Sequence, residues 1–171
     1  YLLCAIGTPC IYYGTEQGFS GEGSDDKFIR EAMFDLDNPD VNYLNRNCTI
    51  YQEIAKIAKL FQQIAALRFG RMYFREISGN GRDFGLPQSQ PCTLAFSRIL
   101  AGEEVLIAYN TSTTERRKDF VIVDRDIHNK PRNNMRFIYG KQGTIRVQKH
   151  PDNESRFIQL QLEPMQFVIL Q

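Results

Sequence analysis

The sequence predicts a mainly β fold, in which a shorter α/β segment precedes an antiparallel β domain. Beyond residue 70, apolar side chains recur with a period of two in short runs that are separated by turn residues. No helical pattern lies between these runs, which is typical of an antiparallel β-sandwich or a Greek-key barrel. Before residue 70, the long periodic stretch 48–69 has helical spacing instead. We therefore divide the chain into residues 1–70, the α/β unit, and residues 71–171, the β domain.

Length and charge argue against several classes of protein. The chain has 171 residues, enough for one domain or for one domain with part of another. Its 21 Lys and Arg residues nearly balance 20 Asp and Glu residues, whereas a general nucleic-acid binder needs a basic excess. No apolar run approaches the ~20 residues of a transmembrane helix. We therefore expect neither a nucleic-acid partner nor a membrane partner.

The first element predicted is a short strand at Cys10–Tyr13, bounded by Pro9 and Gly14. It is apolar on both faces, as strands of parallel sheets and barrels are. Residues 1–6 are predicted to be the end of a helix that Gly7 closes. The chain begins inside this apolar stretch, so we expect the partner strands in sequence before it. We also expect residues 1–14 either to pair with a second copy or to fold back onto the helix at 50–69.

Residues 15–47 are predicted to form a long loop, because glycine, aspartate and asparagine recur there without periodicity. The clearest helix follows at 48–69. Its apolar stripe is formed by Ile50, Ile54, Ile57, Phe61 and Ile64, which share one face and must pack on a sheet or barrel.

Sequence signals also predict the ends of this helix. Thr49 and Gln52 fit a capping box at its start, and Gly70 fits a left-handed residue just beyond its end.

The β domain is predicted from runs of alternating residues. We place strands at about 72–77, 93–99, 104–109, 119–124, 135–139, 143–148, 156–162 and 165–170. Aromatic residues on these runs fall at core positions, so packing is favoured over sugar stacking for them.

Neither a metal nor a cofactor is predicted for this chain. The cysteines are Cys4, Cys10, Cys48 and Cys92, and they form no CxxC pair. His128 and His150 stand alone in polar segments, away from metal-ligand spacing. Isolated thiols fit the cytosol but do not exclude secretion, so the compartment stays open.

One motif carries a specific resemblance. The run GTPCIYYGTEQG, from Gly7 to Gly18, resembles the last barrel strand of the α-amylase family of glycoside hydrolases, with its pattern G-x-P-x-I-Y-Y-G-x-E. The run from Asp26 to Phe34 resembles the loop that follows in that family, although Glu31-Ala32 replaces the usual Glu-Pro. By the same resemblance, 50–69 corresponds to the last barrel helix, and the strands after it to the all-β domain C.

This resemblance implies a parent enzyme that acts on α-glucans or oligosaccharides with retention, using two carboxyl groups. In the family these carboxylates lie on earlier barrel strands, so we expect no catalytic residue here and a chain that is inactive alone. Loops after barrel strands build the active-site face, so Tyr13, Glu16, Asp26 and Arg30 are the predicted substrate-binding residues. The resemblance leaves open whether the parent binds calcium and whether it hydrolyses or transfers glucans.

Two other functions are compatible with the sequence. The β domain by itself could be a carbohydrate-binding sandwich, or the chain could be a protein-interaction module that docks through its apolar first segment. The predicted site residues also have a structural interpretation, in which Glu16 and Asp26 are turn carboxylates and Arg30 holds the loop through an ion pair.

Overall fold

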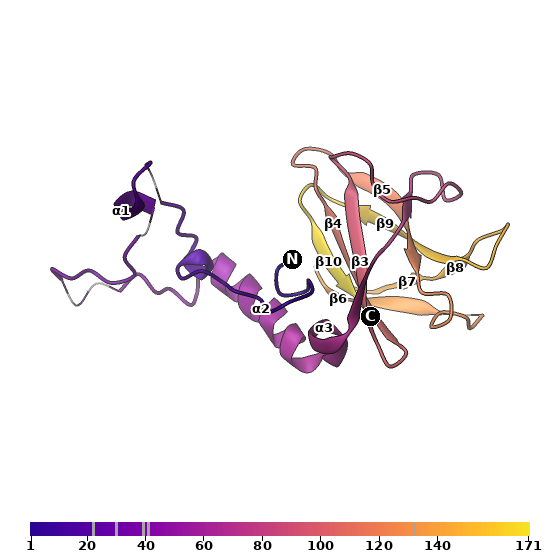
Figure 1. Ribbon diagram of the computed structural model, residues 1–171, viewed down its shortest axis with the longest axis horizontal. Coiled ribbons are helices and arrows are strands. Elements are labelled where there is room, and N and C mark those ends of the chain that lie inside the picture. Colours follow the sequence, from indigo (N-terminus) through magenta and orange to yellow (C-terminus); the bar gives the residue numbers. More distant parts are fainter. Residues whose placement is uncertain (22, 30, 39, 41, 132) are drawn as a thin grey trace.

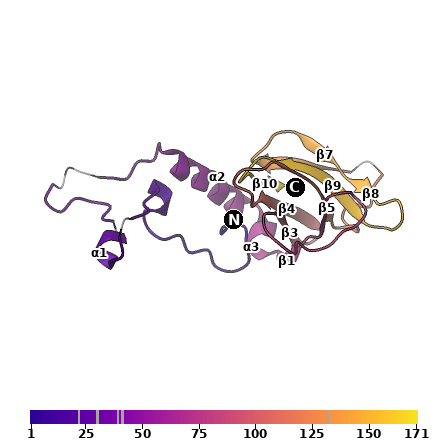
Figure 2. The same ribbon diagram turned by 90° about the horizontal axis from the view of Figure 1, so that it is seen from above.

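The chain folds into three layers, two of them β-sheets (Figure 1). The computed structural model describes residues 1–21, 23–29, 31–38, 40, 42–131 and 133–171. The strands gather at one end of the molecule, α2 extends away from them, and residues 15–47 lie at the far end of that helix (Figures 1 and 2). Within the described residues, no helix has both the length and the apolar character needed to cross a membrane.

The two sheets form the predicted antiparallel sandwich. The larger sheet has the order β1 (Arg71–Phe74), β3 (Thr93–Leu100), β4 (Glu103–Asn110), β10 (Phe167–Leu170), β6 (Asn134–Tyr139) and β7 (Thr144–Arg146). The smaller sheet has the order β2 (Ile77–Ser78), β5 (Arg117–Val123), β9 (Arg156–Leu162) and β8 (Gln148–Lys149). The paired strands are antiparallel.

Strand alternation divides the apolar residues between two cores. Leu106, Val121, Ile158, Leu160 and Val168 fill the space between the sheets. Because neighbouring residues on a strand point to opposite faces, the alternate positions of β3, β4 and β10 form a second apolar surface on the outer face of the larger sheet. This second surface is where the helical layer packs.

The helical layer covers that outer face through α2 (Thr49–Gln63) and α3 (Ala65–Phe69). Ala66 and Leu67 of α3 are fully buried there, while Ile57 and Phe61 of α2, and Ile64 between the two helices, are half-buried against the same cluster. The stripe predicted from the sequence is therefore only partly covered, and Ile50 at its start is exposed.

The helix predicted over 48–69 is interrupted at Ile64, whose backbone is extended at φ −102° and ψ 108°. The predicted capping box is wrong, since Cys48 occupies the N-cap and makes no side-chain cap bond. The left-handed role predicted for Gly70 is also wrong, because its φ is −64°. A Cβ at this position would lie 2.4 Å from the carbonyl oxygen of Ala66 and 3.0 Å from the backbone of Ile99, so close packing is what requires glycine.

The strand predicted at residues 10–13 does not form: these residues are exposed and join neither sheet. A strand needs neighbours to satisfy its backbone groups, and no described strand pairs with this segment. Instead, Ile11 and Tyr12 line a hollow of about 360 Å³ whose opposite wall includes Ile54 and Ile57 of α2. The segment therefore runs along the helix in this structure.

Residues 1–5 are docked on the larger sheet. They form a single helical turn in which the N–H groups of Cys4 and Ala5 donate to the carbonyl of Tyr1, at 2.8 and 3.1 Å. Cys4 is fully buried, and the ring of Tyr1 makes an edge contact with Phe96 at 5.6 Å between centroids. Gly7 follows at φ 107°, a conformation that favours glycine and lets the chain turn away.

Candidate functional site

The motif that resembles the family folds into a compact turn at the start of the long loop. Gly14 and Gly18, at φ 79° and 78°, flank the 3-10 turn η1 (Thr15–Gln17). The N–H of Phe19 donates to the carbonyl of Gly14 at 3.0 Å, which closes the turn. A Cβ on Gly14 would lie 2.5 Å from the Phe19 ring, so the first glycine is required both by conformation and by space.

The N-terminal end of α2 holds this turn in place. The thiol of Cys48 donates to the carbonyl of Glu16 at 3.2 Å, and the N–H of Asn45 donates to the side-chain oxygen of Gln17 at 2.7 Å. Gly18 approaches Ile50 so closely that a Cβ would lie 3.0 Å from its terminal methyl group. These contacts fix the half-buried Glu16 in the wall of an open hollow of about 820 Å³ beside α2.

The other predicted site residues lie apart from that wall. Tyr13 is exposed, and its ring packs on Tyr12 at 4.7 Å between centroids with a tilt of 43°. Asp26 is exposed at the start of the short helix α1 (Asp26–Ile29), which stands away from η1 in Figure 1. Arg30 lies outside the described residues. Neither Tyr13 nor Asp26 lines the hollow that contains Glu16.

A second hollow in the loop, of about 470 Å³, was not predicted from the sequence. Its lining consists of Phe19, Glu31, Ala32, Phe34, Asp35, Leu36 and Tyr43. It combines aromatic faces with two carboxylates, a mixture suited to a ligand that has apolar faces and hydroxyl groups. The signal available in the sequence was the aromatic residue that ends the second family-like run, Phe34, whose side chain is exposed.

Hydrogen bonds within the loop shape this hollow. The N–H of Gly21 donates to a carboxylate oxygen of Glu31 at 2.5 Å. The N–H of Tyr43 donates to the carbonyl of Met33 at 3.1 Å, and Phe34 forms an isolated antiparallel bridge with Asn42. The loop thus has local order even though it is remote from both cores.

The β domain has a polar centre built around Glu104, whose side chain is fully buried. Its carboxylate accepts hydrogen bonds from Ser97 at 2.5 Å, from Arg75 at 2.7 Å and from the N–H of Asp124 at 2.9 Å. His128 Nε2 lies 3.0 Å from the second oxygen, although the ring is not aligned for a regular hydrogen bond. Burial raises the pKa of Glu104, but these neighbours outweigh it and hold the pKa below its usual range.

This polar centre explains the polar residues that interrupt the apolar alternation of β3 and β4. Ser97 and Glu104 sit inside the sandwich because each completes the hydrogen bonding of the other and of Arg75. In the part of the chain that the structure describes, the hydroxyl of Ser97 bonds to the carboxylate and makes no hydrogen bond to His128, so the trio is not arranged as a nucleophile with its base.

The cysteines are all free thiols. Cys4 and Cys92 are buried, Cys48 is half-buried and Cys10 is exposed. Burial raises the pKa of the Cys4 thiol to about 11, which keeps it protonated near neutral pH. Among the residues that the structure describes, no three His, Cys, Asp or Glu side chains come together as metal ligands.

Comparison with known proteins gives sequence relatives. No family model matches the chain. A cyclomaltodextrin glucanotransferase of Geobacillus stearothermophilus is 31% identical over 113 residues, which covers 66% of this chain and 13% of that protein. An α-amylase of Streptomyces lividans is 34% identical over 121 residues, covering 67% of this chain and 13% of that protein. The chain thus spans about an eighth of the length of the curated relatives it matches.

Solved structures share the fold over nearly the whole chain. A cyclomaltodextrin glucanotransferase described as having a three-domain distribution matches 98% of this chain with a TM-score of 0.68 at 20% identity, over 30% of its own length. A debranching enzyme from Nostoc punctiforme matches 99% with a TM-score of 0.63 at 24% identity, over 29% of its length. Sequence and fold relatives agree: the chain is similar to α-amylase-family glycoside hydrolases and resembles their C-terminal part.

Proposed function

We propose that this chain is part of an enzyme that acts on α-glucosidic bonds of glucans or oligosaccharides with retention of configuration. The observation that carries the proposal is the sequence match to an amylase and a glucanotransferase, supported by the shared fold. These two relatives are named for different reactions, so the proposal covers hydrolysis and transfer alike. Either reaction proceeds through a carboxylate nucleophile and a carboxylic acid that flank the scissile bond.

Within that enzyme, we assign residues 1–70 to the catalytic barrel and residues 71–171 to the β domain that follows it. The loop after residues 10–13 then lies at the sugar-binding face, where Tyr13, Glu16, Asp26 and Arg30 contact substrate. The rigid turn that holds Glu16 supports this assignment, since a binding group works best when its position is fixed before the ligand arrives. No calcium site is assigned to the described residues.

The chain by itself is inactive under this proposal, because the family's catalytic carboxylates lie on barrel strands that come earlier than the strand motif beginning at Gly7. The test is to incubate the pure chain with starch, maltooligosaccharides and an activated α-glucoside, beside the Glu16→Gln variant. No turnover is expected from either protein. Turnover by the chain that Glu16→Gln abolishes would contradict the proposal. Retention on a starch column without turnover would instead favour a carbohydrate-binding module.

The isolated chain also associates with itself through residues 1–14 under this proposal. Tyr1, Leu2, Ile6, Ile11 and Tyr12 expose large apolar side chains there, and no described strand pairs with residues 10–13. Sedimentation at low micromolar concentration should show a dimer that Ile11→Asp dissociates. Leu36→Asp is the matched control, because Leu36 is 95% exposed but lies on the distant loop. A wild-type monomer, or equal effects of both variants, would refute self-association.

A further inference from the structure

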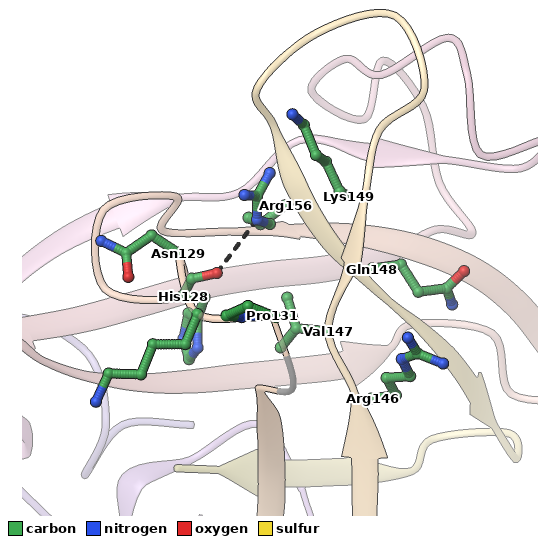
Figure 3. A pocket seen from close by; sticks show the side chains of 9 residues that line it. His128, Asn129, Pro131, Arg146, Val147, Gln148, Lys149 and Arg156 are labelled. Atoms are coloured by element: carbon green, nitrogen blue, oxygen red, sulfur yellow. Dashed lines mark hydrogen bonds between the residues drawn. The ribbon is translucent and has the colours of Figure 1, made fainter.

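The β domain carries a basic hollow that the proposed glucan chemistry does not use. It has a volume of about 530 Å³, within the range of small-molecule sites. Figure 3 shows the turn with His128, Asn129 and Pro131 on one side, and the chain from Arg146, at the end of β7, to Lys149 of β8 on the other. The neighbouring β7 and β8 lie at the opposite end of the molecule from the loop 15–47 (Figure 1).

The lining has an unbalanced positive charge. It includes Lys130, Arg146, Lys149 and Arg156 but no carboxylate. Lys149 pairs with Glu154 at 2.7 Å, outside the lining. Within the described part of the chain, neither Lys130 nor Arg146 makes an ion pair. These two cations are therefore available to an anionic ligand.

Arg156 is held in place without being neutralised. Its Nε donates to the carbonyl of His128 at 3.2 Å, the dashed line in Figure 3, and its Nη1 donates to the carbonyl of Glu154 at 3.1 Å. Carbonyl oxygens satisfy its donors but carry no full charge to cancel the guanidinium. The positive charge at the back of the hollow therefore persists. The hydrogen bond from Lys149, the charge of Lys149 and, to a smaller degree, the charge of Arg156 hold the pKa of the exposed Glu154 below its usual range.

The turn that forms one wall is ordered by its own contacts. The N–H of His128 donates to the carbonyl of Asp124 at 3.0 Å, and its Nδ1 bonds to the side-chain amide of Asn133 at 2.9 Å. The opposite wall is tied to the same asparagine, since the N–H of Val147 donates to the carbonyl of Asn133 at 2.9 Å. Both walls thus share one anchor, so little ordering is needed before a ligand binds.

We propose that this hollow binds the phosphate group, a tetrahedral oxyanion, of a small phosphorylated saccharide. The saccharide part of the proposal rests on the proposed function. Lys130 and Arg146 supply charge-assisted hydrogen bonds to the phosphate oxygens. The side-chain amides of Asn129 and Gln148, which also line the hollow, bond to sugar hydroxyls. Free inorganic phosphate offers the same anionic chemistry without the hydroxyls, so the experiment separates these two sources.

The test is calorimetric titration of the full chain with glucose 6-phosphate, inorganic phosphate and maltose, at low and matched ionic strength. Glucose 6-phosphate should bind, phosphate should bind more weakly and maltose should not bind at this site. Arg146→Gln and Lys130→Gln should each weaken glucose 6-phosphate binding about tenfold, and Arg146→Lys should restore part of it. The control is Lys118→Gln, an exposed cation at the other end of the β5–β9 ladder from Arg156, which should change nothing.

The outcomes are distinct. Equal binding of phosphate and the sugar ester supports the oxyanion site and assigns it to the free anion. Absence of binding by both anions overturns the proposal, as does binding that Arg146→Gln and Lys130→Gln leave unchanged or that Lys118→Gln weakens equally. Circular dichroism of each variant separates lost binding from lost folding. Maltose binding and glucan turnover test the proposed function separately, so failure of one proposal does not imply failure of the other.

Discussion

Replacing Arg98 should detach the first helical turn from the β domain. Arg98 lies on β3 and is only 3% exposed. Its guanidinium donates to the carbonyls of Ala5 at 2.7 Å, Cys4 and Gly70 at 3.1 Å each, and Arg68 at 3.4 Å. One side chain therefore joins the N-terminal turn, the end of α3 and the start of β1.

The size of the effect follows from these bonds. Arg98→Met leaves two buried acceptors, on Cys4 and Gly70, without a donor, at about 1–3 kcal/mol each. Part of this cost is offset, because burial disfavours the charged guanidinium, as the lowered pKa of Arg98 indicates. We expect a net loss of about 3 kcal/mol in the free energy of unfolding. Arg98→Lys should lose less, since an ammonium keeps the charge but reaches fewer carbonyls.

Urea denaturation measures the loss, and amide hydrogen exchange locates it. Exchange of the Cys4 and Ala5 amides should accelerate in Arg98→Met, because both donate within the turn that Arg98 holds. Arg136→Met, which removes an exposed arginine from β6, is the matched control and should have little effect. A loss below about 1 kcal/mol in Arg98→Met, or unchanged exchange in the first turn, would refute the role assigned to these hydrogen bonds.

Three further predictions concern buried groups. Glu104→Gln should lower the free energy of unfolding by about 3 kcal/mol, because it leaves cations and donors around a neutral amide. Since the folded pKa of Glu104 is lowered, the carboxylate stabilises the fold above the ordinary carboxyl range, and this contribution is lost as pH falls through the folded pKa. Urea denaturation at a series of pH values should therefore show a smaller loss of stability at acid pH in the variant, and an unchanged acid dependence would contradict this. Gly70→Ala should destabilise the fold by about 1–3 kcal/mol in thermal melts, because its Cβ would press on a carbonyl of α3. Gly79→Ala is the control and should be nearly neutral, since nothing lies within 4 Å of a Cβ there. Similar losses in both variants would disprove the close-packing argument. Iodoacetamide should modify the exposed Cys10 well before the buried Cys4. Because the pKa of Cys4 is raised to about 11, its contribution to stability is present below the ordinary thiol range and is lost as pH rises toward that value. Equal labelling rates at neutral pH would show that the turn does not bury Cys4.

Local pattern in the sequence predicted most of the β domain. The strand predicted at 156–162 is β9, and that at 93–99 is β3 to within one residue. Strand alternation is a local property, since each side chain is placed by its own position on the pleat. The family motif from Gly7 to Gly18 was equally local, and its resemblance agrees with the relatives found by comparison. The site residues within and after that motif remain predictions.

Tertiary structure decided what the local pattern could not. The sequence could not say that β10 lies between β4 and β6, nor that Arg98 and Glu104 would be buried, because each depends on partners far away along the chain. The same reason explains the errors. Residues 10–13 have the composition of a buried strand, but a strand exists only where other strands pair with it. Gly70 has the identity of a helix-ending residue, but the backbone of β3 beside it sets its conformation. The sequence by itself determined which segments could become strands and helices, and long-range contacts determined which of them did.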